Sequence, residues 1–369
     1  MADATIYGTL DQAVISIGMT AATTGTKTTA KSFGEDLNGV SELGVKGSED
    51  LGNGLTATYG VNFSYGLSTS ANTPAIYNGS GVGVKGEFGA VSIGTSYNLN
   101  FFTNAAADPT GFGGNIGQLN SSAGGLKGNL ISYTAPQFVP GLSLAAEIQR
   151  GEASTSAGNM TGYMAQYSTG GLMVRYSNSS KTEAANATTT TTAIKDAVTT
   201  TTYTASNQMT SSSIGGTAAA TTNGGTGLSA RAANDKTKTT AVAVTYDFGM
   251  AKAFYGSSSI KSSSTVAQIK TSTTGISVPF GAIGVGYAVS SEKGTMDGTA
   301  IDSTTGVTQV TYASGDTVES TASRLFLTYA LSKRTTVYAI SAKASVDSIA
   351  GASSLLKTTI TSVGIKHGF

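Results

Sequence analysis

Two groups of residues in this 369-residue sequence have types and spacings that suggest chemistry, and the first is a glycine pattern. The stretch GVGVKG places Gly81, Gly83 and Gly86 at the spacing of a dinucleotide-binding loop. Such a loop must open a helix whose N-terminus receives the pyrophosphate. The residues that follow, GEFGAVSIGTSY, alternate as a strand does. We therefore expect no nucleotide cofactor.

The second group consists of the side chains that serve catalysis or metal binding elsewhere. His367 is the sole histidine, and the chain has no cysteine, so no thiol or second imidazole is available to share a metal ion. In a Ser–His–Asp site, His367 would have to act from the apolar face of an alternating segment. Glu49 and Asp50 resemble paired catalytic carboxylates, but adjacent residues point to opposite faces of a strand. These patterns predict neither an enzyme nor a metal site.

The composition is unusual for a soluble protein. Charged residues make up 12% of the chain, against about 25% in a typical soluble domain. The net charge is +1 and glycine occurs 48 times, which argues against an electrostatic nucleic-acid binder. No apolar run reaches about 18 residues, the length of a transmembrane helix.

The stretch GLTATYGVNFSYGL, residues 54–67, shows the pattern that dominates the chain. Its alternate positions carry apolar or aromatic residues, and the positions between them carry small polar ones. This period of two predicts a long strand with one apolar face. Similar runs recur in pairs joined by short turns of Gly, Pro, Asn or Asp. Seven such hairpins plus the first and last strands give about sixteen strands.

The connections between hairpins are long and rich in Ser, Thr, Gly and Asn. We expect them at 18–39, 66–79, 98–127, 179–238, 291–320 and 344–356. Short turns at one rim and long loops at the other are typical of outer-membrane barrels. In a bilayer a sheet must close on itself to satisfy its backbone, with one face toward lipid and the other toward water. A soluble β-sandwich is the alternative, but it does not explain the scarcity of charge.

We therefore predict one domain over residues 1–369: an all-β, closed antiparallel transmembrane β-barrel of about 16 strands with short periplasmic turns and long extracellular loops. The segment 179–238 is of low complexity, so disorder or a loosely ordered surface loop is expected there.

Several motifs resemble one known family. They are TIYGTLD, SELGVKGSEDLGNGL, GVKGEFGAVSIGTSY, NLISYTAPQF, YALSKRTTVY and the closing VGIKHGF, in this order along the chain. Together they resemble the trimeric, sixteen-stranded porins of Gram-negative outer membranes, especially the neisserial type. Several loops, above all 179–238, match nothing in that family.

The resemblance implies a homotrimer in the outer membrane, exported by a signal peptide that this sequence does not include. It also implies that loop 98–127 folds into the lumen as a constriction. Family members end in an aromatic residue that the barrel-assembly machinery recognises, which gives Phe369 the role of an assembly signal. Phe369 also suits the aromatic girdle at the membrane interface.

Alternation assigns a set of charged residues to the lumen. The basic ones are Lys46, Lys85, Arg175, Lys252, Arg324 and Lys366, and the acidic ones are Asp11, Glu42, Glu147 and Asp247. Loop 98–127 adds only Asp108 and Lys127, and Ser132 stands where relatives often carry an arginine. We expect Lys46 and Lys85 to face Asp108 across a thinly charged constriction. Each of these charges either sets selectivity or is simply a solvated wall residue.

The leading functional hypothesis is a passive diffusion channel for ions and small hydrophilic solutes, with a weak preference for anions. One alternative is a surface protein whose barrel is an anchor and whose loops 179–238 and 291–320 mediate adhesion or lattice contacts. Another is a channel for a specific solute, which nothing in the sequence names. The expected partners are outer-membrane lipid, the assembly machinery and further copies of the chain.

Overall fold

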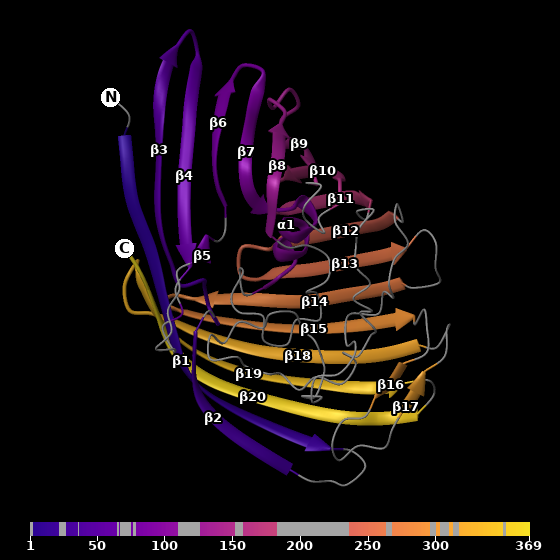
Figure 1. The fold of residues 1–369 in the computed structure, drawn as a ribbon. Coiled ribbons are helices and arrows are strands. Elements are labelled where there is room, and N and C mark those ends of the chain that lie inside the picture. Colours follow the sequence, from indigo (N-terminus) through magenta and orange to yellow (C-terminus); the bar gives the residue numbers. More distant parts are fainter. Residues whose placement is uncertain are drawn as a thin grey trace.

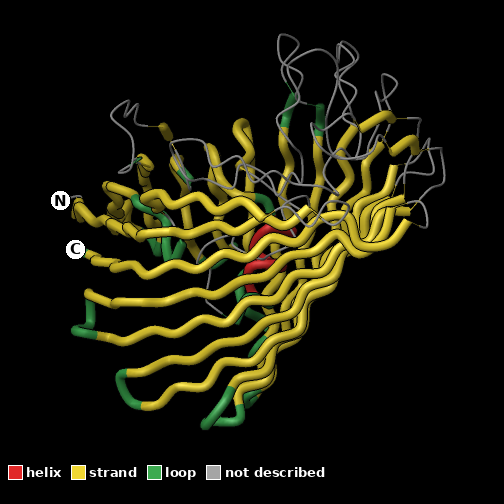
Figure 2. The backbone as a smooth tube through the Cα atoms, turned by 90° about the horizontal axis from the view of Figure 1, so that it is seen from below, coloured by secondary structure: helices red, strands yellow, loops and turns green. Residues whose placement is uncertain are grey.

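The computed structural model describes residues 3–21, 27–35, 37–64, 66, 75–76, 79–109, 126–151, 158–182, 236–262, 268–295, 300–302, 310–312, 317–349 and 352–369. Most of them lie in antiparallel strands of one sheet, whose first and last strands pair with each other. Figures 1 and 2 show the resulting barrel, with the chain ends close together. Among the described residues, no helix is long and apolar enough to cross a membrane.

Sixteen of the eighteen strands of this sheet form the barrel wall. They are β1 (Asp3–Ala21), β3 (Glu42–Gly52), β4 (Leu55–Ser64), β6 (Ser80–Gly86), β7 (Gly89–Tyr97), β8 (Leu126–Thr134), β9 (Leu142–Gln149), β10 (Met160–Thr169), β11 (Leu172–Thr182), β12 (Lys236–Asp247), β13 (Lys252–Ser262), β14 (Gln268–Phe280), β15 (Ile283–Thr295), β18 (Thr317–Ala330), β19 (Thr335–Ile349) and β20 (Ala352–Gly368). The other two, β2 (Lys27–Glu35) and β5 (Ala75–Ile76), pair along parts of β1 and β4. β16 (Ala300–Asp302) and β17 (Val310–Tyr312) form a separate small sheet. The predicted barrel of about sixteen strands is confirmed.

Short connections join the hairpins at one rim of the barrel. They occupy residues 53–54, 87–88, 135–141, 170–171, 248–251, 281–282 and 331–334. In the first of them Gly52, Asn53 and Gly54 have φ of 79°, 52° and 75°. This left-handed region suits glycine and asparagine, which explains why the motif GNG makes a tight turn there.

The other rim carries the remaining connections, and several differ from the prediction. β1 reaches Ala21 and β2 begins at Lys27, so much of the predicted loop 18–39 is strand. β19 and β20 likewise occupy most of the predicted loop 344–356. Two connections, 150–159 and 263–267, were not predicted. Residues 183–235 of the predicted loop 179–238, and 110–125 of loop 98–127, lie outside the described residues.

Exposure of the side chains follows the predicted alternation. Val61 is 41% exposed on the outer face and its neighbour Asn62 is 4% exposed on the inner face. On β1, Leu10 and Val14 are exposed, whereas Asp11 and Ala13 between them are buried. The apolar face of the strand at 54–67 therefore points away from the lumen.

Strand length varies around the barrel. β3, β4, β6, β7, β8 and β9 have 7 to 11 residues and form what we call the low wall. β12, β13, β14, β15, β18, β19 and β20 have 11 to 17 residues and form the tall wall. Figure 1 shows the low wall in indigo to magenta and the tall wall in orange to yellow. β1 pairs with both walls, because β3 and β20 are its neighbours.

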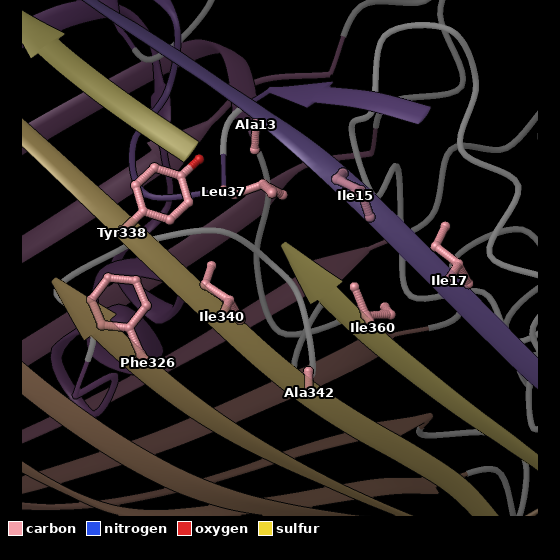
Figure 3. Packing of buried hydrophobic residues seen from close by; sticks show 9 residues of the cluster. All are labelled: Ala13, Ile15, Ile17, Leu37, Phe326, Tyr338, Ile340, Ala342 and Ile360. Atoms are coloured by element: carbon pink, nitrogen blue, oxygen red, sulfur yellow. The ribbon is translucent and has the colours of Figure 1, made fainter. Parts of the chain in front are cut away.

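One sector of the inner face is apolar. Figure 3 shows a buried cluster on β1, β18, β19 and β20 made of Ala13, Ile15, Ile17, Phe326, Tyr338, Ile340, Ala342 and Ile360, together with Leu37. Ile15 is fully buried although its neighbours Val14 and Ser16 point outward. The expectation that the whole inner face is polar and meets water is therefore wrong in this sector.

Candidate functional site: the lumen and its inward segments

A short helix inside the barrel follows β7. Helix α1 (Leu99–Ala106) begins at Asn98, whose side chain accepts a hydrogen bond of 2.9 Å from the Phe101 N–H. An asparagine at this position satisfies an N–H group that the first turn leaves unbonded. The first helical N–H group, that of Leu99, donates to both carboxylate oxygens of Glu147 on β9 at 3.1 and 3.2 Å. The helix N-terminus is thus fixed to the inner face of the wall.

The body of α1 is held by β11. The Asn100 side chain donates to the Ser179 hydroxyl at 2.6 Å and accepts from the Ser177 hydroxyl at 2.7 Å. The Arg175 guanidinium donates to the Phe102 carbonyl at 3.0 Å and to Gln166 Oε1 at 2.7 Å. Because Arg175, Ser177 and Ser179 alternate along one strand, all three point into the lumen. Figure 1 shows α1 beside β11.

The residues after the helix are seated on the tall wall. A Cβ atom at Gly256 would lie 2.5 Å from the Ala107 Cβ, and one at Gly275 would lie 2.7 Å from the Pro109 Cγ. Real Cβ contacts are longer than this, so only glycine leaves room for the segment. Between these two contacts, Arg324 on β18 forms an ion pair of 2.6 Å with Asp108, and both side chains are 1–2% exposed. Residues 107–109 are therefore anchored by shape and by charge.

A second segment, residues 37–41, turns inward between β2 and β3. Both strands lie on the same edge of β1, where Glu35 pairs with Gln12 and Glu42 with Thr9. The six residues 36–41 of the chain therefore correspond to only two residues of β1, 10 and 11. The extra residues form a bulge away from the edge of β1. Asp11 accepts hydrogen bonds from the Asn38 N–H and the Tyr338 hydroxyl. The Lys366 ammonium donates to the Asn38 carbonyl at 2.7 Å.

A cavity of about 450 Å³ lies between the two inward segments. Its lining includes Asn38 from one segment, Pro109 from the other, and Asp247, Lys252, Phe326 and Lys366 from the wall. The cavity is thus bordered by two ammonium groups and one carboxylate. Within the described residues, no group of three or more His, Cys, Asp or Glu side chains could hold a metal ion.

Two of the predicted lumen residues, Asp108 and Arg324, are brought into contact. This ion pair corrects the expectation that Asp108 stands across the lumen as the acidic partner of Lys46 and Lys85, because its carboxylate is occupied by a closer cation. Lys127 also differs from the prediction, since it belongs to β8 and not to the loop. It lies near enough to Glu147 to interact electrostatically.

The remaining predicted residues lie apart from this ion pair. The Lys46 ammonium sits 4.8 Å from the centre of the Tyr7 ring. Glu42 accepts a hydrogen bond of 2.8 Å from the Asn62 amide. Lys85 is exposed and stands opposite Thr56, close to a short turn. Phe369 pairs its backbone with Gly8 through hydrogen bonds of 3.0 and 3.1 Å.

Sequence reasoning did not identify the residues that position these groups. Asn98, Asn100, Gly256 and Gly275 hold the inward segment, yet none was singled out. Two signals were available: an asparagine before an apolar run is typical of a helix N-cap, and an isolated glycine within a strand indicates close backbone approach. The segment 37–41 carries no comparable signal.

The comparisons with known proteins agree with this architecture. A family model described as Gram-negative porin matches residues 1–347. A major outer membrane protein P.IB of Neisseria gonorrhoeae is 31% identical over 195 residues, which cover 49% of this chain and 55% of that protein. A protein of the same name from Neisseria lactamica is 35% identical over 108 residues, covering 29% and 31%. The chain thus spans about half the length of the first of these relatives.

Solved structures share the fold. The anion-selective porin from Comamonas acidovorans superposes with a TM-score of 0.70 at 19% identity, with both chains covered completely. OmpT of Vibrio cholerae in its trimer form gives a TM-score of 0.59 at 12% identity over 100% of this chain and 99% of that one. The family match, the relatives and the closed barrel lead to one conclusion: this chain is an outer-membrane β-barrel that belongs to the Gram-negative porin family.

Proposed function

We propose that the chain forms a water-filled channel through which ions and small hydrophilic solutes diffuse passively across the outer membrane. Barrels of sixteen strands are wide enough to enclose an aqueous passage. The observation that carries the proposal is the combination of a closed barrel with inward segments that are held against its inner wall and narrow the lumen. We propose a transport role without chemistry, in keeping with a family of channels.

Loop 98–127 is proposed as the constriction, and its described residues 98–109 support this role. The loop enters the lumen at Asn98, crosses β9 and β11 as α1, and reaches the tall wall at Asp108. Because residues 98–109 are held by wall residues at both ends, we propose that they narrow the passage without having to move.

The proposed weak anion preference rests on the distribution of charge in the lumen. Asp108 neutralises Arg324, and Lys366 and Lys127 lie near Asp11 and Glu147. Lys46 and Lys85 on the low wall, by contrast, are exposed, and neither forms an ion pair within the part of the chain that the structure describes. Their field is screened beyond about 8–10 Å at physiological salt. The preference is therefore weak and vanishes as salt rises.

Assembly is proposed by analogy with relatives. We propose a homotrimer, since a solved neighbour is described in a trimer form. Phe369 is proposed as the residue that the barrel-assembly machinery recognises. Phe369 lies at the end of β20, where the last strand pairs with β1 and closes the barrel. This place suits a residue that the assembly machinery recognises while the barrel closes.

Two measurements on the purified full-length chain test the channel itself. Planar lipid bilayers record single-channel currents, and liposomes loaded with polymer report swelling when neutral sugars enter. We expect stepwise currents and swelling that slows as the sugar becomes larger. A folded protein that gives neither current nor swelling would contradict the proposal and favour a barrel that anchors adhesive loops. Swelling by a single sugar alone would favour a solute-specific channel.

A further inference from the structure

Exposed lysines gather on the outer face of the tall wall and of β2. They are Lys27, Lys31, Lys236, Lys238, Lys261, Lys270, Lys293, Lys343 and Lys357, which we call the lysine collar. Each alternates with residues that face the lumen. Lys270, for example, stands between buried Ile269 and buried Thr271. The collar therefore faces the surroundings of the barrel and not its passage.

The collar lies beyond the apolar band, toward the rim with the long connections. On β15 the outward residues run Ile283, Val285, Tyr287 and Val289 from the short turn, and then change to Ser291 and Lys293. On β14 they run Phe280, Val278 and Ile276, and then Thr274, Ser272 and Lys270. The same order of apolar, hydroxyl and ammonium side chains recurs on β12 and β20. This order places the ammonium groups at the level of lipid headgroups.

Two pairs of directly opposed lysines in the collar are unfavourable for the stability of the isolated chain. Lys238 stands directly opposite Lys261, and Lys270 directly opposite Lys293. Like charges in directly opposed positions of a sheet destabilise it. Among the described side chains of these strands, Glu319 is the exposed carboxylate on the same face, and it binds Lys293 at 2.6 Å. This one carboxylate cannot balance the four ammonium groups of the two opposed pairs.

The low wall lacks this arrangement. Its lysines within the described part, Lys46, Lys85 and Lys127, all lie on the lumen face. Its outer face is apolar, with Val82, Ile93 and Ile131 exposed. Within the described strands, the outward-facing lysines are thus confined to one side of the barrel and to one level of the membrane.

We propose that the lysine collar binds phosphate groups of anionic lipids in the leaflet around the long-loop half of the barrel. Lysine binds phosphate as a compact positive charge, and clustered basic residues at a membrane surface recruit anionic headgroups. A bound phosphate between two opposed lysines turns a repulsive pair into a bridged one. The inference rests on the membrane location of the barrel and not on its conductance, so either can fail without the other.

The test uses the folded full-length chain in zwitterionic detergent and measures binding of diphosphoryl lipid A. The variant Lys238→Gln/Lys270→Gln removes one lysine from each opposed pair. The matched control Lys333→Gln/Arg334→Gln removes two charges from a short turn at the opposite rim. The dephosphorylated lipid and inorganic phosphate serve as comparison ligands.

We expect the collar variant to bind diphosphoryl lipid A roughly 10- to 30-fold more weakly, in line with the contribution of each lysine near an anionic surface. The control variant and Lys238→Arg/Lys270→Arg keep wild-type affinity. Binding to the wild type falls steeply with salt, and the dephosphorylated lipid does not bind. Unchanged affinity in the collar variant, or equal binding of the dephosphorylated lipid, overturns the proposal. Tight binding of inorganic phosphate that excludes the lipid overturns it as well, since the site then takes a free anion.

Thermal unfolding without lipid supplies a second readout. Since Lys238 and Lys261 repel each other, the collar variant should be at least as stable as the wild type in plain detergent. Added lipid A should raise the unfolding temperature of the wild type more than that of the variant. Equal shifts in both proteins count against the collar, and a variant that fails to fold in plain detergent contradicts the repulsion on which the inference depends.

Discussion

The low wall and the tall wall share the alternation of outward and inward residues, but they differ in strand length and in the side chains that they present. Strands of 9–11 residues suffice to cross a bilayer, and the low wall stays near that length. The tall wall adds residues that the crossing does not need. On its inner face it supplies Gly256, Gly275 and Arg324, which hold residues 107–109. On its outer face it carries most of the lysine collar.

We propose that this difference also decides where solutes meet charge. The described part of the inward segment runs from Glu147 on β9 past β11 to the tall wall, where Arg324 neutralises Asp108. Lys46 and Lys85 of the low wall remain exposed. We therefore propose that the tall wall supports the constriction and that the low wall supplies the field felt by ions.

The strongest way to break the barrel is to disturb the place where the walls meet. Phe369 pairs with Gly8 on β1, and on its other side Gly8 pairs with Leu43 of the low-wall strand β3. Deleting Phe369, or replacing it with Asp, should lower outer-membrane levels by about ten-fold or more while leaving the conductance of any assembled channels unchanged. Surface labelling of cells and recordings on purified protein check this, and normal surface levels would refute it. Phe369→Tyr is the control and should assemble normally.

The next largest effect is expected at the buried ion pair. Arg324→Ala leaves the Asp108 carboxylate buried without its cation, which typically costs about 3–5 kcal/mol in the free energy of unfolding. Current noise should rise as the segment loses its anchor. The double variant Arg324→Leu/Asp108→Leu removes both charges and should regain more than half of the loss. Denaturant unfolding in detergent measures this, and additive losses in the double variant would contradict a direct pair.

A smaller effect is expected at the glycine seats. Gly256→Ala introduces a methyl group 2.5 Å from the Ala107 Cβ, so the segment must shift. Overpacking of this kind costs about 1–3 kcal/mol. Gly60→Ala on the low wall is the matched control, because its nearest neighbour would be 3.6 Å away. Equal stability and equal current noise in the two variants would show that the seat does not hold the segment.

The smallest effect is expected from the longest connection. Deleting residues 190–230, between β11 and β12, should leave barrel folding and conductance close to wild type. Long loops add little to the entropy of closure, and this composition buries little apolar area. Gel mobility of heated and unheated samples reports barrel folding. Failure of the shortened chain to fold would mean that the segment packs on the tall wall.

Much of the barrel was predictable because the bilayer imposes alternation on each strand. The pattern fails where the bilayer ends. At Gly18–Ala21 and at 344–349 the strands continue largely through small residues such as Gly18, Ala21 and Ala344, so strand resembled loop and the predicted ends fell short. The inner apolar cluster around Ile15 was missed for a related reason, since alternation marks one face as apolar and here both faces are.

The residues that hold the inward segments could not be predicted, because they lie far from those segments in the sequence. Asp108 and Arg324 are 216 residues apart, and alternation places Arg324 in the lumen without naming its partner. The bulge at 37–41 follows from a register difference along β1 that appears only when both strand pairs are known. Gly256 and Gly275 look like many other strand glycines until the segment they receive is located.

The most direct test of the division between the walls is the reversal potential of single channels under a salt gradient. We expect the wild type to show a small potential in the direction of anion preference at low salt, and we expect this potential to be lost at high salt. Lys46→Glu/Lys85→Glu should reverse its sign, whereas Lys333→Glu at the short-turn rim should leave it unchanged. Strong cation selectivity of the wild type, or an unaltered potential in the low-wall variant, would contradict the account.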